Sequence, residues 1–338
     1  MKKLHSALSK ANEEKRRLVV PLLGFPGLQL TNSTIKLAQQ NYGEHYKVLK
    51  EIADTFKPDA IFPLMDLSVE ANAIGRYTLF PKEESATVVK DEFAKKDLDT
   101  IKNINIAYDT RLIGYVETIK LMREELPANI LRGAYVTGPY TLAGLLLSAD
   151  EAALATKVNT DYLHEICGIV TKIIQDYVSL LINAGAVIIC ILEPSAVMLG
   201  PQQFVEFSGN YVKSLCSEYK NTDVSFIYHI CGNTNHIIKH MAQSGVDALS
   251  LDSPEAGIDL FEIMQNVKED MIIIGNISPI GKMLFGTRSS VETEVKNLLN
   301  KMTGFPNFIL STGCDLPQET PLENIHAFMN TGRNYRMM

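Results

Sequence analysis

The stretch VIICILEP, residues 187–194, is a continuous apolar run that ends at a glutamate and a proline. Continuous runs rich in β-branched residues, rather than strictly alternating ones, are typical of strands buried on both faces of a parallel sheet. Residues 161–185 before it carry apolar residues at helical spacing and end on Gly185, where a helix C-cap would lie. Similar apolar runs occur at residues 19–25, 60–66, 131–139, 225–231, 248–252, 271–277 and 308–315.

Eight apolar runs that alternate with helical segments predict an α/β protein, a single (β/α)8 TIM barrel with an N-terminal helical extension. We expect one domain over residues 1–338, because the chain has no low-complexity linker. Residues 75–130 are the least regular part, and there we expect a loop and a small hairpin over the barrel mouth. The alternative is an open doubly wound sheet, but no phosphate-binding glycine motif follows any of the apolar runs.

The composition is that of a globular protein, with 46% hydrophobic and 21% charged residues. A net charge of -7 argues against a nucleic-acid partner, whose phosphates would favour a basic face. No apolar run approaches the ~20 residues that span a bilayer. The first residues offer no apolar segment for a signal peptide. We therefore expect a cytoplasmic protein without a membrane partner.

Polar residues gather where the predicted strands end, which is where barrel enzymes carry their chemistry. We expect four of them to line a substrate pocket: Asp66, Glu70, Glu193 and Asn276. The alternative for these four is helix capping or hydrogen bonding at strand ends. Three further cysteines, Cys167, Cys190 and Cys216, lie in apolar or helical stretches and are expected to be small buried hydrophobes.

His229 and Cys231 end one predicted strand, and residues i and i+2 of a strand point to the same side. Cys314 ends the last predicted strand, and its side chain can converge on them at the barrel mouth. One imidazole and two thiolates suit Zn²⁺ better than Mg²⁺ or Ca²⁺, and three protein ligands leave a fourth position open. Asp252, at the end of the neighbouring strand, is expected to supply a weak carboxylate that the substrate displaces. The alternative for His229 and Cys231 alone is a packed pair in the core.

Five segments together resemble the uroporphyrinogen decarboxylase superfamily. Within it they are similar to the methylcobamide:coenzyme M methyltransferases of methanogens and their bacterial relatives. The resemblance extends over essentially the whole chain, and it implies that His229, Cys231 and Cys314 hold zinc. Asp252 stands where that branch has a longer, zinc-associated glutamate. The segments are PLMDLSVEANAIG (63–75), GPYTLAGLL (138–146), YHICGNTNHII (228–238), IGNISP (274–279) and GCDLPQETPLENIHAF (313–328).

The resemblance implies a zinc-dependent methyltransferase that moves a methyl group from a protein-bound methylcobamide to a thiol such as coenzyme M. Zinc would keep the acceptor sulfur as a nucleophilic thiolate, with Asp252 assisting. No D-x-H-x-x-G segment for cobalt ligation occurs in the chain. We therefore expect a separate small corrinoid (B12-binding) protein to carry the cobalamin-type cofactor and to dock on the barrel mouth.

Three alternatives remain open at this point. The acceptor could be tetrahydrofolate rather than a thiol, within the same family. The chain could be a metal-free decarboxylase of the porphyrin type, although residues 19–37 contain no arginine where that enzyme has an arginine-rich segment. It could also be a non-catalytic barrel that binds a corrinoid protein, which the retention of all three ligands argues against.

Overall fold

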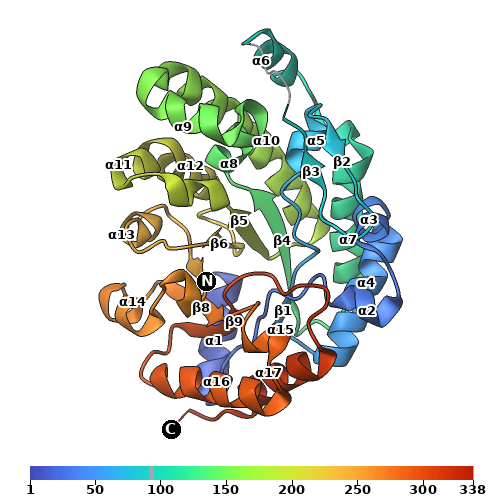
Figure 1. The fold of residues 1–338 in the computed structure, drawn as a ribbon, viewed down its shortest axis with the longest axis vertical. Helices are drawn as coiled ribbons and strands as arrows, with labels where there is room; N and C mark the ends of the chain where they lie inside the picture. The colour runs from blue at the N-terminus through green and yellow to red at the C-terminus, as the bar shows by residue number, and fades with distance from the viewer. Residues whose placement is uncertain (91–94, 338) are drawn as a thin grey trace.

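The computed structural model describes residues 1–90 and 95–337. Its centre is a curled, seven-stranded parallel sheet surrounded by helices (Figure 1). Each strand of this sheet pairs in parallel with the strand of the sheet that follows it along the chain, so the connections run over the outside of the sheet, as in a TIM barrel. The strands, in their order in the sheet, are β1 (Ala60–Ile61), β4 (Leu131–Thr137), β5 (Ile188–Leu192), β6 (Ser225–Ile230), β7 (Ala248–Leu251), β8 (Ile272–Ile277) and β9 (Phe308–Thr312).

The position of an eighth strand, between β9 and β1, is filled by the segment around Val19. Val19 pairs with Leu310 of β9 as a single parallel bridge, and the Asp59 amide donates to the Val19 carbonyl over 3.1 Å on the other side. The run predicted over 19–25 does not continue as a strand, because Pro21 has no N–H to donate to a ladder. The α/β barrel prediction is confirmed, with this one strand reduced to a bridge.

The N-terminal helix α1 (Lys3–Glu13) closes the end of the barrel opposite the carboxyl ends of the strands. Its buried residues Leu4 and Leu8 pack in the same apolar cluster as residues inside the barrel, such as Ile188 and Ile272. The predicted N-terminal helical extension is therefore present, and it has a structural role. Active sites of this fold lie at the other end, where the strands lead into their loops.

The remaining helices form the outer layer, and their ends follow local capping rules. The Asp109 side chain accepts from the Leu112 amide to begin one helix, and Gly185 ends another with a φ of 122° that favours glycine. The helices are α2 (Gly27–Thr31), α3 (Ile35–Gln40), α4 (Tyr42–Phe56), α5 (Val69–Ala73), α6 (Lys95–Ile101), α7 (Thr110–Glu125), α8 (Pro139–Leu147), α9 (Ala149–Val158), α10 (Thr160–Ala184), α11 (Pro201–Phe204), α12 (Asn210–Glu218), α13 (Ile238–Met241), α14 (Leu260–Asn266), α15 (Lys282–Phe285), α16 (Arg288–Lys301) and α17 (Leu322–Asn334).

Two apolar layers result from the alternation of side chains along the strands. On β5, Cys190 and Leu192 point into the barrel, while Ile189 and Ile191 pack against the helices. The predicted burial of Cys190, Cys167 and Cys216 is confirmed.

The predicted hairpin is present as β2 (Thr78–Leu79) paired antiparallel with β3 (Thr87–Val88). Residues 91–94, a few residues after β3, lie outside the described residues. No helix in the described parts of the chain is long and apolar enough to cross a membrane.

Candidate metal centre

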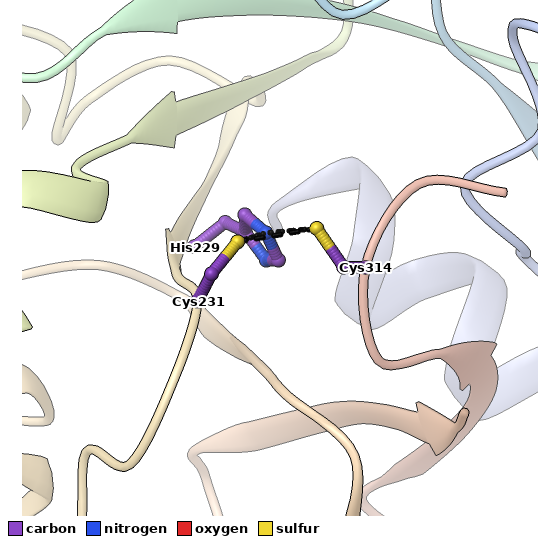
Figure 2. A group of neighbouring side chains, drawn as sticks. All are labelled: His229, Cys231 and Cys314. Atoms are coloured by element: carbon purple, nitrogen blue, oxygen red, sulfur yellow. Dashed lines mark hydrogen bonds between the residues drawn. The ribbon is translucent and has the colours of Figure 1, made fainter. Parts of the chain in front are cut away.

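Three side chains predicted as ligands meet at the carboxyl end of the barrel. The Nε2 atom of His229 lies 3.1 Å from the Cys231 sulfur and 3.7 Å from the Cys314 sulfur, and the two sulfurs are 3.1 Å apart. Figure 2 shows the two cysteines pointing toward each other, with the His229 ring beside Cys231. Among the described residues, these three are the group of metal-binding side chains that comes together.

The strand geometry accounts for this convergence. Ile227, two residues before His229, lies in the cluster inside the barrel, so the alternation along β6 also directs His229 inward. Gly232, with a φ of 88°, turns the chain away directly after Cys231. On the other side, a Cβ atom on Gly313 would lie 2.5 Å from the Ser253 amide nitrogen. A glycine is therefore required for β9 to approach the end of β7 this closely, and Cys314 follows it.

The two thiols differ in acidity because they share a hydrogen bond. The hydrogen bond between the two sulfurs, together with His229, lowers the pKa of Cys314 despite its burial. The same bond and burial raise the pKa of Cys231. The pair therefore gives up its first proton more readily than its second, and a bound cation would neutralise the two thiolates.

The donor set fits a zinc ion. A tetrahedral Zn²⁺ with Zn–S bonds of about 2.3 Å places its sulfur ligands about 3.8 Å apart. The present spacing of the three donor atoms differs from that of such a site by less than about 1 Å. Imidazole and thiolate are also the ligands that Zn²⁺ prefers over oxygen donors. These residues can hold zinc with one position left for a substrate.

The carboxylate of Asp252, just after β7, lies beside this group and bonds to backbone. Its Oδ2 accepts from the Gly232 amide and its Oδ1 from the Ser253 amide, each over 2.6 Å. Its oxygens are not part of the compact group of three ligand atoms. Ligation by Asp252 stays a prediction.

Asp66 forms a buried ion pair that sequence reasoning missed. Its carboxylate accepts from the Arg111 guanidinium and, over 2.8 Å, from the Tyr115 hydroxyl, both on α7. Arg111 also stacks on the Phe80 ring, with its guanidinium carbon Cζ 4.7 Å from the ring centroid. No sequence signal links Asp66 to a helix 45 residues away.

The carboxylates of two other predicted pocket residues, Glu70 and Glu193, accept hydrogen bonds from backbone amides and side-chain hydroxyls. Glu70 accepts from the Thr137 amide over 2.7 Å and lies 2.9 Å from the Thr137 hydroxyl, at the end of β4. Glu193 accepts from the Thr141 amide in the first turn of α8 and from the Ser208 hydroxyl. Burial raises the pKa of each carboxyl to about 7.

Asn276, the fourth predicted pocket residue, is buried in β8. Its amide group donates to the carbonyls of Asp252 and Ile258 over 2.9 and 3.2 Å. It therefore joins β8 to the loop that carries Asp252. Glu70, Glu193 and Asn276 therefore make hydrogen bonds of the kind that the capping alternative describes, whereas Asp66 is paired with Arg111.

Comparison with known proteins places this chain in a family. A family model described as Uroporphyrinogen decarboxylase (URO-D) matches residues 31–335. Methylcobamide:CoM methyltransferase MtbA from Methanosarcina mazei is 27% identical over 283 residues, which cover 82% of this chain and 80% of that protein. A uroporphyrinogen decarboxylase from Prochlorococcus marinus is 24% identical over 300 residues, which cover 85% of this chain and 83% of the relative.

Solved structures show the same fold. A methyltransferase from Methanosarcina mazei superposes with a TM-score of 0.85 at 23% identity, over 97% of this chain and 96% of the other. A B12-independent methionine synthase from Shewanella matches with a TM-score of 0.58 at 11% identity, over 93% and 96% of the two chains. The resemblance predicted from sequence segments is confirmed: this chain is a member of the uroporphyrinogen decarboxylase (URO-D) family of enzymes.

Proposed function

We propose that the protein is a zinc-dependent methyltransferase that moves a methyl group from a protein-bound methylated corrinoid to a thiol such as coenzyme M. The observation that carries this proposal is the convergence of His229, Cys231 and Cys314 at the barrel mouth. The similarity to a protein named as a methylcobamide:CoM methyltransferase supports it.

Zinc, when bound, would keep the acceptor sulfur deprotonated at neutral pH, where a free thiol with a pKa of about 8.5 is mostly protonated. His229 supplies a neutral donor, and Cys231 and Cys314 supply two negative charges that balance the cation. Both cysteines are partly exposed and His229 is buried. The sulfur side of the site therefore faces the mouth, where acceptor and donor can enter.

The chemical step is a displacement at carbon. A lone pair of the acceptor sulfur forms the S–CH₃ bond while the cobalt–carbon bond of the methylated corrinoid breaks. Both electrons of that bond stay on cobalt, which passes from Co(III) to Co(I), and the thiol proton goes to solvent. The products are a thioether and the reduced corrinoid. The barrel contributes by holding the sulfur at the mouth within reach of the methyl group.

Asp252 is proposed to occupy the fourth position, directly or through water, until the acceptor arrives. Its hydrogen bonds to Gly232 and Ser253 hold the carboxylate beside Cys231 and leave lone pairs on both oxygens. For Glu70 and Glu193, the contacts favour a role in helix capping or hydrogen bonding at strand ends, because each carboxylate accepts from backbone amides and hydroxyls. Asp66 and Asn276 are proposed to shape the mouth through their buried partners.

The methyl donor is proposed to arrive on a small corrinoid protein that docks on the barrel mouth. The relative named above supports a corrinoid as the methyl donor, because its name describes a methylcobamide:CoM methyltransferase. A tetrahydrofolate acceptor is the second candidate. A porphyrinogen decarboxylase is the third, since relatives of that name are 24% identical.

The test measures zinc and methyl transfer on the same preparations. We expect about one Zn²⁺ per chain and transfer from methylcobalamin to coenzyme M, both lost in Cys314→Ala. Cys216→Ala is the matched control, because it removes a buried thiol from α12 and should change neither quantity. Transfer to tetrahydrofolate alone would support the second candidate. Porphyrinogen decarboxylation by metal-free protein would contradict the proposal.

A further inference from the structure

Ser250 of β7 forms a hydrogen bond with the ring of His229. Its hydroxyl oxygen lies 2.9 Å from Nδ1, the ring nitrogen that faces away from the cysteines. The two residues are direct partners in the parallel β6–β7 pairing, so both side chains point into the barrel. His229 is 1% exposed and Ser250 2%, which leaves water no access to this bond.

The bond decides how the imidazole can serve the site. A neutral ring carries one proton, so Nε2 can offer a lone pair to a metal only when the proton is on Nδ1. A hydroxyl beside Nδ1 accepts that proton's hydrogen bond and stabilises this tautomer. The bond also prevents rotation of the ring, because a flip would break it and leave a buried nitrogen without a partner.

A hydroxyl differs in one useful way from the carboxylates that often hold ligand histidines. It can accept a hydrogen bond from Nδ1–H or donate one to an unprotonated Nδ1. The same serine therefore accommodates the ring with and without a metal. The hydroxyl also adds no negative charge. The complex of a divalent cation with two thiolates and one imidazole therefore stays neutral overall, and the cation keeps its affinity for a third sulfur.

We propose that Ser250 is a positioning residue that fixes the tautomer and orientation of His229, so that Nε2 faces the sulfurs. This inference rests on the metal site of the proposed function, but not on methyl transfer. The competing explanation is that a small residue is needed at this position only for packing. The two explanations differ for a variant that keeps the hydroxyl group.

Ser311 provides a matched control within the same barrel. It is fully buried on β9, and its hydroxyl has no hydrogen-bond partner among the described residues. Ser311→Ala therefore removes the same atom from the barrel as Ser250→Ala, without removing a hydrogen bond. Ser250→Thr keeps the hydroxyl and adds a methyl group on a β-branched side chain that strands favour.

The experiment compares zinc affinity, by competition with a chelator, in wild type and the three variants. We expect Ser250→Ala to weaken zinc binding by about 10- to 100-fold, while Ser311→Ala binds like wild type and Ser250→Thr recovers most of the affinity. Nitrogen NMR of ¹⁵N-histidine-labelled zinc protein, with His229→Ala for assignment, should show the proton on Nδ1 of His229 in wild type.

Equal zinc affinity in wild type and Ser250→Ala overturns the inference, as does a proton on Nε2 in the zinc-loaded wild type. Wild-type protein that takes up no zinc overturns it too. A loss of affinity confined to Ser250→Ala, in a protein that transfers no methyl groups, supports the inference and contradicts the proposed function instead. Circular dichroism of each variant excludes loss of the fold as the cause.

Discussion

The Asp252 carboxylate accepts a hydrogen bond of 2.6 Å from the Gly232 amide, and so joins the end of β7 to the turn that follows Cys231. The bond lies next to a candidate metal ligand but uses only one lone pair of the carboxylate. Asp252 therefore has two possible effects on the site, through the conformation of the Cys231 turn and through its charge.

Cys231→Ala should lose zinc, whereas Asp252→Ala should keep most of it and lower methyl transfer by about tenfold, because the carboxylate positions the incoming thiol. Asp252→Asn separates the two effects, since its amide oxygen can still accept from Gly232 without carrying charge. Zinc content and turnover are measured on all three variants. If Asp252→Ala empties the site as fully as Cys231→Ala, Asp252 is a full ligand. If it changes neither quantity, the residue is only a polar group at a strand end.

Zinc removal should leave the fold intact and expose one specific pair of cysteines to oxidation. Cys231 and Cys314 lie 3.1 Å apart between their sulfurs, and the low pKa of Cys314 supplies the reactive thiolate. Cys167, Cys190 and Cys216 should not react, because burial raises the pKa of each thiol. Mild oxidant should therefore lower the number of free thiols in metal-free protein by two and leave the number in the zinc form unchanged. The free thiols are titrated after the protein has been oxidised and then unfolded. Peptide mapping that finds a disulfide to any of the other three cysteines would contradict this.

Glu70 should make the stability of the protein fall with rising pH. Burial raises its pKa from 4.5 to about 7. A carboxyl group with a higher pKa in the folded state binds its proton more tightly there, so the free energy of unfolding decreases as the pH rises from about 4.5 to about 7. The two hydrogen bonds that Thr137 donates favour the ionised carboxylate, but the effect of burial on the pKa is larger.

Glu70→Gln keeps hydrogen bonding to Thr137 and removes the titration. Between pH 4.5 and 7 the free energy of unfolding should decrease less in this variant than in wild type. The difference between the two decreases should reach up to about 3 kcal/mol. Urea unfolding at a series of pH values measures the difference, with Glu292→Gln on the surface of α16 as control. Parallel curves for Glu70→Gln and wild type would show that Glu70 does not titrate in this range.

Arg111→Ala should destabilise the protein by about 3 to 5 kcal/mol, because it leaves the buried Asp66 carboxylate without its cation. Arg288→Ala, which breaks the exposed pair with Glu292, should cost less than about 1 kcal/mol. The double variant Asp66→Ala with Arg111→Ala should be less destabilised than the sum of the two single variants. Additive losses in chemical denaturation would mean that the two side chains do not stabilise each other.

Local patterns in the sequence determined the positions of the strands and two of the three candidate metal ligands, His229 and Cys231. Buried strands need continuous apolar runs, and β5 lies where VIICIL predicts it. His229 and Cys231 share one side because the pleat of a strand repeats every two residues, which holds wherever the strand is placed. Pro21 could have indicated that the run over 19–25 ends early as a strand.

Only the tertiary structure decided which groups meet across the chain. Cys314 is 83 residues from Cys231 and reaches it because Gly313 lets β9 approach the end of β7. Ser250 and Arg111 carry no motif, and their roles follow from the register of β7 on β6 and from the packing of α7 on Asp66. Both faces of a barrel strand are apolar, so the sequence around Glu193 does not show that its side chain contacts α8. Periodicity along a chain specifies which residues share a face, but contacts between distant segments depend on how the strands close into a barrel.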